Sequence, residues 1–333
     1  MMKRFRIRRA MLTASLLALT AICLPPSARA ADPAALQGQL NALAQRARPG
    51  SMGISVLDLQ SGKTWRVNAD QSYPMMSVFK APVAATVLDR IEHGQNSFDQ
   101  TITLTRADLE NGIIRQQFHG AQMRFSVRQL LGYMVSQSDN TAVDALLRLI
   151  GGPAVVQSYL HAHGIDGLHV EHDEAGNTRL FNALAIGEQA PANETDAQQD
   201  QRYLRGYRMF LADPGNRSTP DAAVLFLHKL WQRELLSPAS TTYLLDLMNA
   251  QVVPNRMRAG LPEGVRLADK CGTSDTIDGL TAAYNDIGIL TWPDGHTVIV
   301  AAFLSASNSP EAERERLYVD LAKSVTTALH PQK

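Results

Sequence analysis

The sequence contains almost no cysteine. Of its 333 residues only Cys23 and Cys271 are cysteines, and Cys23 lies within the first 30 residues. If that segment is removed, as argued below, one thiol remains and an intramolecular disulfide is excluded. Stability must therefore come from a hydrophobic core, and a chain of this length is long enough to bury one.

The sequence also lacks an apolar run of membrane-spanning length and an excess of positive charge. The uncharged stretch Ala10–Leu24 is shorter than the roughly 20 residues that a spanning helix needs. Basic and acidic residues number 32 each, but six basic residues and no acidic ones lie in the first 30 positions. The remainder is acidic, so we expect neither nucleic acid nor an anionic membrane surface as a partner.

The first 30 residues have the layout of a secretory signal peptide. A basic start precedes the apolar Ala10–Leu24, and Ala28-Arg29-Ala30 offers small residues at a cleavage site. Arg8-Arg9 leaves twin-arginine export open beside ordinary secretion. Ile22 before Cys23 fits a lipoprotein cleavage site poorly, so we expect no stable membrane anchor. We predict cleavage near residue 30 and a periplasmic or secreted protein.

Strand patterns occur near both ends of the chain, and helix patterns lie between them. Apolar alternation and short apolar runs predict strands at 51–59, 63–67, 265–270, 280–290 and 296–305. Helical spacing predicts helices at 77–93, 126–135, 141–150, 153–163, 219–232, 238–250 and 310–329. We therefore expect one α/β lobe formed by 31–73 and 251–333, with an inserted helical lobe at 74–250.

A polar stretch interrupts the helix patterns in the middle of the chain. Gln189–Tyr203 contains several glutamines and a proline, and no apolar period is visible in it. We interpret it as part of an extended surface loop at about 178–213, with local disorder as the open alternative.

Ser77-Val78-Phe79-Lys80 places a hydroxyl and an amine three residues apart on a predicted helix. Residues at this spacing are neighbours on a helix surface, so the amine can help to remove the proton of Ser77 and make it a nucleophile. The pair alone is weak evidence, because serine and lysine are common.

Two later motifs give the pair a context. Ser138-Asp139-Asn140 precedes a predicted helix and is equally typical of a helix cap. Lys270-Cys271-Gly272-Thr273 ends a predicted strand and alone indicates no more than a turn glycine. The order S-x-x-K, S-D-N, K-x-G-[ST] is, however, the motif set of class A β-lactamases and penicillin-binding proteins.

The chain resembles the class A serine β-lactamases, and within them the PER- and VEB-type extended-spectrum branch. The resemblance covers nearly all of the chain after residue 30. It is carried by the stretches 73–80, 133–140, 150–152, 254–256 and 272–286. It implies an α+β fold of the serine β-lactamase and penicillin-binding-protein kind, in which helices flank an antiparallel sheet beside an all-helical lobe.

The resemblance also implies a role for each motif residue. Ser77 would attack the lactam carbonyl, and Lys80 with a water would accept its proton. Backbone N–H groups of Ser77 and Thr273 would form the oxyanion hole. Ser138 would pass a proton to the leaving nitrogen, and Asn140 would hold the amide side chain of the substrate. Lys270 would orient Ser138 and attract the substrate carboxylate, and Thr273 would add a hydroxyl contact.

Hydrolysis further requires a general base that directs water at the acyl ester. Counting from Gly151-Gly152 without a gap places Glu174 at the position where relatives carry a glutamate. Glu171 with a small gap, or Thr178 in an alignment anchored on Asn182, are the alternatives. A solvated loop carboxylate is the simpler interpretation of Glu174.

Three features depart from the family pattern or compete with it. The segment between Glu174 and Arg217 is longer than in relatives and puts substrate range and deacylation rate in question. Cys271 stands where a hydroxyl residue is usual, either as a small buried strand residue or as a thiol activated by Lys270.

His161, His163 and Asp166 resemble the start of a zinc motif, but the aspartate comes one place late. The two imidazoles also point to different faces of a helix, so we expect surface histidines and no metal.

We therefore predict an exported, monomeric serine β-lactamase that hydrolyses penicillins and cephalosporins without a cofactor or metal. A D-alanyl-D-alanine peptidase shares the nucleophile chemistry, and a well-placed deacylating carboxylate separates the two. A β-lactam-acylated sensor or a nearly inactive homologue is the alternative outside catalysis. Many turnovers of a β-lactam, as opposed to one stable adduct, would distinguish them.

Overall fold

The computed structural model describes residues 33–185 and 188–330, so the predicted signal peptide lies outside the described residues. The strands are β1 (Ser51–Asp58), β2 (Thr64–Val67), β3 (Tyr73–Pro74), β4 (Thr101–Thr105), β5 (Gln122–Ser126), β6 (Arg217–Ser218), β7 (Arg266–Thr273), β8 (Thr276–Ile277), β9 (Leu280–Thr291) and β10 (Thr297–Ser307). The α-helices are α1 (Pro33–Arg46), α2 (Lys80–Glu92), α3 (Ile113–Gln117), α4 (Val127–Ser136), α5 (Asn140–Ile150), α6 (Pro153–Ala162), α7 (Glu174–Phe181), α8 (Asp196–Ala212), α9 (Pro220–Trp231), α10 (Pro238–Asn249) and α11 (Glu311–Leu329). Three short 3₁₀ helices are η1 (Met76–Phe79), η2 (Arg106–Asp108) and η3 (Arg256–Gly260).

The main sheet joins strands from both ends of the chain. Its order is β2-β1-β10-β9-β7, with β8 also paired to β9, and every neighbouring pair is antiparallel. β10 lies between β1 and β9 and so brings the first and last strands of the chain together. This position explains why strand patterns occur at both ends of the sequence.

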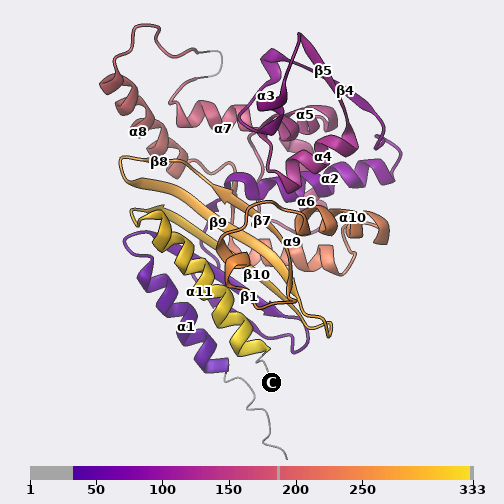
Figure 1. The fold of residues 1–333 in the computed structure, drawn as a ribbon, viewed down its shortest axis with the longest axis vertical. Helices are drawn as coiled ribbons and strands as arrows, with labels where there is room; N and C mark the ends of the chain where they lie inside the picture. The colour runs from indigo at the N-terminus through magenta and orange to yellow at the C-terminus, as the bar shows by residue number, and fades with distance from the viewer. Residues whose placement is uncertain (1–32, 186–187, 331–333) are drawn as a thin grey trace, which may run out of the picture. The chain divides into compact units, whose positions relative to one another are not determined.

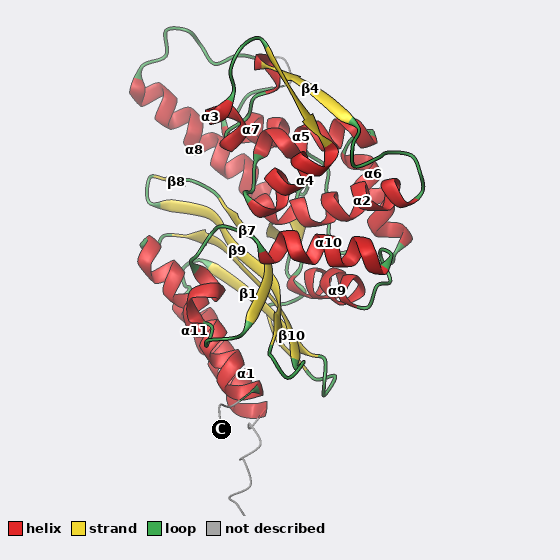
Figure 2. Ribbon diagram, turned by 45° about the vertical axis from the view of Figure 1, so that its right-hand side comes forward, coloured by secondary structure: helices red, strands yellow, loops and turns green. Residues whose placement is uncertain are grey.

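Helices cover both faces of this sheet. Along β10, Val298, Val300 and Leu304 belong to the core with α1 and α11, which run side by side in Figure 1. Ile299, Ala301 and Phe303 belong to the second core, on the side where Figure 2 shows α9 and α10. Because successive side chains of a strand point to opposite faces, two covered faces require an almost continuous apolar run.

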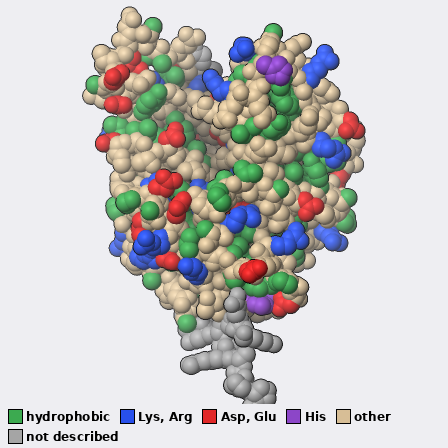
Figure 3. Space-filling view, viewed as in Figure 1, with side chains coloured by type: hydrophobic (Ala, Val, Ile, Leu, Met, Phe, Trp, Pro, Cys, Tyr) green, Lys and Arg blue, Asp and Glu red, His purple; other side chains and the backbone are tan. Residues whose placement is uncertain are grey.

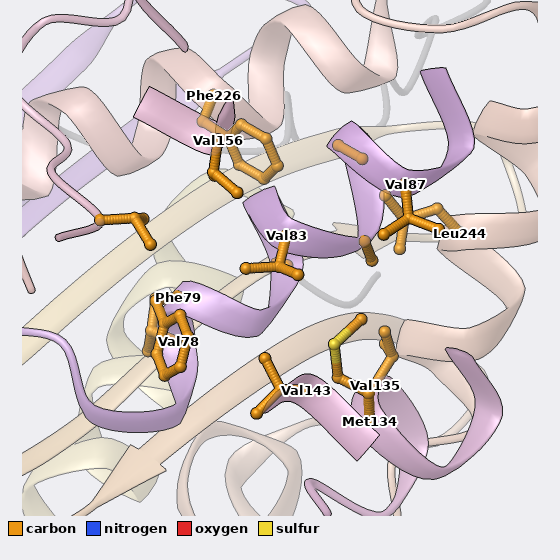
Figure 4. Packing of buried hydrophobic residues seen from close by; sticks show 14 of the residues in the cluster. Val78, Phe79, Val83, Val87, Met134, Val135, Val143, Val156, Phe226 and Leu244 are labelled. Carbon is orange, nitrogen blue, oxygen red and sulfur yellow. The ribbon is translucent and has the colours of Figure 1, made fainter. Parts of the chain in front are cut away.

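Helix α2 is the centre of the second core. Its first nine residues, Lys80 to Leu88, are all buried, as expected for a helix with protein on every side. Figure 4 shows Val83 and Val87 of this helix among side chains from α4, α5, α6, α9 and α10. A helix packed in this way holds its first residue, Lys80, in a fixed position.

The α+β fold with an antiparallel sheet and flanking helices is confirmed. Every helix and strand predicted above is present, with ends displaced by up to three residues, except that 77–93 divides into η1 and α2. The pattern analysis missed α1, α3, α7, α8, β8 and the small β3–β6 and β4–β5 pairs. The division into two lobes stays a prediction. Within residues 33–185 and 188–330, no helix is long and apolar enough to cross a membrane.

The predicted loop at about 178–213 is wrong for most of its length. Helix α8 begins inside the polar stretch, where Thr195 caps it and the Thr195 N–H donates to Oε1 of Gln198 at 2.9 Å. Its buried face consists of Arg202, Gly206, Tyr207 and Phe210. Because this face contains a glycine and an arginine, the sequence shows no regular spacing of apolar residues there, and the helix was not predicted.

Candidate active site

Ser77 lies in η1, and its hydroxyl is next to the first residue of α2. The Nζ atom of Lys80 donates to Oγ of Ser77 at 2.9 Å, as the three-residue spacing predicts. Lys80 is fully buried and Ser77 is partly exposed. The hydroxyl is thus accessible from the surface while its amine partner is shielded from water.

The backbone around Ser77 is held against the sheet. Met76 has φ +47°, an unfavourable value for a side chain other than glycine. The Asn285 amide on β9 donates to the carbonyl oxygens of Pro74 at 2.8 Å and Met75 at 3.0 Å. Gly272 on β7 passes so close that a Cβ there would lie 3.1 Å from the Ser77 nitrogen and collide with the Met75 carbonyl. The glycine of the third motif is therefore required by this close approach.

Lys80 is surrounded by more acceptors than it can serve with three N–H bonds. Besides Ser77, its Nζ reaches the carbonyl of Ser138 at 2.8 Å and Oδ1 of Asn140 at 2.5 Å. Oε1 of Glu174 lies 3.2 Å away, and its side chain is only 6% exposed. An ammonium has three donors, so four oxygens compete for them.

The motif Ser138-Asp139-Asn140 is both a helix cap and part of the site. Asp139 caps α5, because Oδ1 accepts from the N–H of Ala142 at 2.8 Å. Its other oxygen accepts from the N–H of Ile114 at 2.8 Å and so ties the start of α3 to the same point. The two residues on either side of the cap both contact Lys80, and Ser138 has φ +57°.

Lys270 approaches the same point from β7. Its buried Nζ donates to Oγ of Ser138 at 3.0 Å and to the carbonyl of Cys271 at 3.0 Å. Burial, together with the nearby charge of Lys80, lowers the pKa of Lys270 to about 8. Thr273, three residues further along, is exposed at the end of the strand.

Of the three positions considered for the deacylating base, the geometry favours Glu174. Its carboxylate contacts Lys80, whereas the exposed Glu171 makes its contact through a backbone N–H to Asn216 at 2.8 Å. The hydroxyl of Thr178 lies 3.5 Å from Oε2 of Glu110. Glu174 is the first residue of α7, so the start of this helix determines where the carboxylate lies.

Asp144 on α5 fixes the start of α7 and was missed by the sequence analysis. Its Oδ1 accepts from the N–H of Glu174 at 2.7 Å, and its Oδ2 accepts from the N–H of Ala175 at 3.0 Å. Burial raises the pKa of Asp144 to about 7. Because these residues are 30 positions apart in sequence, no local pattern indicates the contact.

We expect Asp144→Ala to slow turnover about tenfold and to lower the free energy of unfolding by about 1–3 kcal/mol, because two partly buried N–H groups lose their acceptor. Steady-state kinetics at pH 8 and chemical denaturation measure the two effects. Asp246→Ala, at an exposed position of α10, is the matched control. Unchanged kinetics in Asp144→Ala would contradict a role in positioning Glu174.

Two further residues near the site were not assigned a role from the sequence. Asn177 lies one turn after Glu174, is buried, and its Oδ1 has no protein partner. The buried Arg256 donates from Nη2 to the hydroxyl of Thr273. The i, i+3 spacing from Glu174 was the available signal for Asn177. Arg256 is distant in sequence from both Ser77 and Ser138.

A pocket of about 460 Å³ lies beside these residues. Figure 3 shows the surface hollowed between α8 and the segment that contains α3. The pocket is lined by Met76, Asn111, Asn140, Glu174, Asn177, Thr178, Phe181, Asn182, Tyr203, Tyr207, Thr273, Asp275 and Ile277. All three predicted motifs therefore meet at or next to one opening.

Among the described residues, the side chains of Cys271, His161 and His163, which were considered above as alternatives, form no hydrogen bond or ion pair with the residues of this site. Cys271 is 5% exposed within β7, which favours its interpretation as a small buried strand residue. His161 pairs with Asp166 at 2.8 Å, and Nδ1 of His163 lies 2.8 Å from the carbonyl oxygen of Tyr159. In the part of the chain that the structure describes, no group of three or more His, Cys, Asp or Glu side chains is placed to hold a metal ion.

Comparison with known proteins gives concordant matches. The profile of the Beta-lactamase enzyme family matches residues 35–329. β-Lactamase VEB-1 of Pseudomonas aeruginosa is 29% identical over 84% of this chain and 85% of that protein. Extended-spectrum β-lactamase PER-1 of the same species is 30% identical over 83% of this chain and 82% of that protein. The solved structure of a class A β-lactamase assigned to the last common ancestor of Gram-negative bacteria superimposes with a TM-score of 0.72 at 29% identity. The match covers 89% of this chain and 100% of that one.

Proposed function

The chain belongs to the Beta-lactamase enzyme family as a class A serine β-lactamase, and from this membership we propose how its own residues open a β-lactam ring. The resemblance inferred from the motifs is thereby confirmed. The substrates are penicillins and cephalosporins, and the reaction passes through an acyl-enzyme on Ser77. The contact that carries this proposal is the buried Lys80 ammonium between the Ser77 hydroxyl, at 2.9 Å, and the Glu174 carboxylate, at 3.2 Å.

Acylation begins when Lys80 loses a proton, to Glu174 or through a water molecule, and becomes a neutral amine. The amine then accepts the proton of Ser77, and Oγ forms a bond to the lactam carbonyl carbon. As the carbonyl re-forms, the ring C–N bond breaks and the nitrogen receives a proton from the hydroxyl of Ser138. Ser138 then regains a proton from the Lys80 ammonium, and Lys80 takes back the proton that it first gave up, so that Glu174 is again a carboxylate. Lys270, which donates to that hydroxyl at 3.0 Å, orients it and favours the transfer.

The oxyanion of the tetrahedral intermediate is stabilised by the backbone N–H groups of Ser77 and Thr273. The close approach of Gly272 to the Ser77 nitrogen supports this assignment, because it brings the end of β7 beside that N–H group. Asn140 binds the amide of the acyl side chain. Lys270 and Thr273 bind the carboxylate of the substrate, and the buried Arg256 holds the Thr273 hydroxyl and adds positive charge.

Deacylation uses the same three groups, Ser77, Lys80 and Glu174, with Glu174 as the base. Glu174 removes a proton from a water molecule, whose oxygen attacks the ester carbon, and Ser77 leaves with a proton from Lys80. Glu174 then gives the water proton to Lys80, which restores the ammonium and the carboxylate. Asn177 lines the pocket beside Glu174, and its buried Oδ1, which has no protein partner, supplies an acceptor for that water. A carboxylate in this position favours turnover over the stable adduct of a sensor or a peptidase.

The lowered pKa of Lys270 makes a testable prediction for the pH profile. Below pH 8 Lys270 is a cation that attracts the substrate carboxylate, and above pH 8 it loses its proton and this attraction. We expect kcat/KM for benzylpenicillin to fall above pH 8, approaching tenfold per pH unit. In Lys270→Arg the fall should move to higher pH, because a guanidinium keeps its proton. A flat wild-type profile up to pH 10 would contradict the assignment.

We further propose that the protein is exported, that it is cleaved near Ala30, and that it acts as a monomer. The basic and apolar start of the chain supports export. Intact mass of the protein from a periplasmic extract measures the cleavage site. Light scattering measures the oligomeric state.

The direct test of the proposed function is turnover of a chromogenic cephalosporin by the purified protein, with intact mass recorded during the reaction. We expect many turnovers for each molecule of protein and only a transient mass increase. A stable adduct without turnover would favour the sensor or peptidase, and neither adduct nor turnover would exclude all three.

A further inference from the structure

Helix α8 packs on the helix that carries Glu174. Phe181 at the end of α7 stacks on Phe210 of α8 with ring centroids 4.2 Å apart, and it lies 5.1 Å from the ring of Tyr207. Gly206 allows this contact, because a Cβ there would collide with the Phe181 carbonyl oxygen. In Figure 1 the two helices accordingly lie next to each other above the end of the sheet.

The same helix is attached to the end of β7. The hydroxyl of Tyr207 donates to the carbonyl oxygen of Asp275, two residues after Thr273. Tyr207 and Phe210 also share a small apolar core with Ala282 of β9. Helix α8 therefore connects the Glu174 side of the pocket to the Thr273 side and closes the space between them.

One aromatic side chain of α8 is held in place while it lines the pocket. The Arg202 guanidinium lies 4.8 Å from the ring centroid of Tyr203. Arg202 is itself fixed, since Nη1 donates to the carbonyl of Asn182 at 2.8 Å and Nη2 to Glu194 at 2.9 Å. The buried guanidinium thus restricts the Tyr203 ring, which remains partly exposed at the pocket.

We propose that Tyr203 is a specificity-determining residue that binds an aromatic ring on the acylamino side chain of the β-lactam. This inference rests on the proposed function. A substrate amide held by Asn140, with its carboxylate near Thr273, directs the acyl side chain into the pocket. There the side chains of Phe181, Tyr203 and Tyr207 form an aromatic wall. Rings associate favourably in offset or edge-to-face arrangements, and a volume of about 460 Å³ accommodates one.

The chemistry of the wall defines the favoured substrate class. Its aromatic members come from α7 and α8, and the other lining groups from these helices are uncharged amides and hydroxyls apart from Glu174. An aryl-acylamino β-lactam such as benzylpenicillin fills this space. The unsubstituted 6-aminopenicillanic acid has the same bicyclic ring and carboxylate but leaves the space empty. The enzyme therefore favours the first over the second through contacts with α8.

The test compares kcat/KM for benzylpenicillin and for 6-aminopenicillanic acid in wild type, Tyr203→Ala and Tyr203→Phe. We expect the ratio of the two values to fall about tenfold in Tyr203→Ala, because only benzylpenicillin loses a ring contact. Tyr203→Phe keeps the ring and should restore the ratio. Tyr243→Ala, which removes a half-exposed tyrosine from the distant α10, should leave the ratio unchanged.

An equal loss for both substrates in Tyr203→Ala would overturn the proposal and show that Tyr203 only supports the fold. Values of kcat/KM that stay at the wild-type level for both substrates would overturn it as well. Thermal melting of each variant shows whether α8 remains packed. Wild-type protein that hydrolyses neither compound would overturn the proposed function itself. The two failures are therefore distinguishable.

Discussion

Glu174→Gln is expected to become acylated by a β-lactam and to release the product about 10³-fold more slowly than wild type. The amide keeps the size and the hydrogen-bonding reach of Glu174 but cannot remove a proton from water, and a general base contributes about 10²–10⁴-fold to such a step. Intact mass should show an adduct equal to the mass of the substrate. Its decay measures the deacylation rate directly.

The exposed Glu171 offers a matched control three residues away. Glu171→Gln makes the same chemical change and removes the same charge from the same segment, so it should retain wild-type turnover. Normal turnover in Glu174→Gln would contradict the assignment of the base. Loss of turnover without any adduct would show that no water molecule can replace Glu174 as the acceptor of the Lys80 proton, and would contradict the expected acylation of this variant.

The three motifs were predictable because each is local in sequence. Ser77 and Lys80 are one helical turn apart, and Ser138 and Asn140 flank a helix cap, so spacing alone orients the members of each pair. Spacing does not say that the three motifs meet. That step came from the family resemblance, and here the contacts of Lys80 with Ser138 at 2.8 Å and of Lys270 with Ser138 at 3.0 Å bring the motifs together.

The residues that position the site were not predictable in the same way. Asp144 accepts hydrogen bonds from the start of α7, 30 residues away in sequence. Asn285 donates to the backbone just before Ser77 across about 210 residues. Their effect depends on which element packs beside which. The course of α8 was missed for a related reason: its buried face uses Gly206 for close approach and Arg202 for a buried ion pair. Neither contributes to a hydrophobic period.

Ser77→Ala is expected to abolish turnover while leaving the fold at least as stable. Removing a catalytic nucleophile lowers kcat by about 10⁴-fold or more. The stability argument follows from the contacts of Lys80. Without Oγ, its ammonium retains three acceptors, on Ser138, Asn140 and Glu174, which equals its number of N–H bonds. We therefore expect no adduct by intact mass and a Tm equal to or above that of wild type.

The stability measurement distinguishes a catalytic serine from a structural one. Ser158→Ala, on the exposed face of α6, removes a hydroxyl that donates to the backbone at 2.9 Å and should change neither turnover nor Tm appreciably. If Ser77→Ala lost activity and also unfolded at a clearly lower temperature, the hydroxyl would be needed to hold Lys80. Retained activity with a gain in stability would contradict the nucleophile assignment. Lost activity with unchanged or higher stability is the expected result. Four oxygens compete for the three N–H bonds of Lys80, so the Oγ atom of Ser77 is required for the reaction and not for holding Lys80.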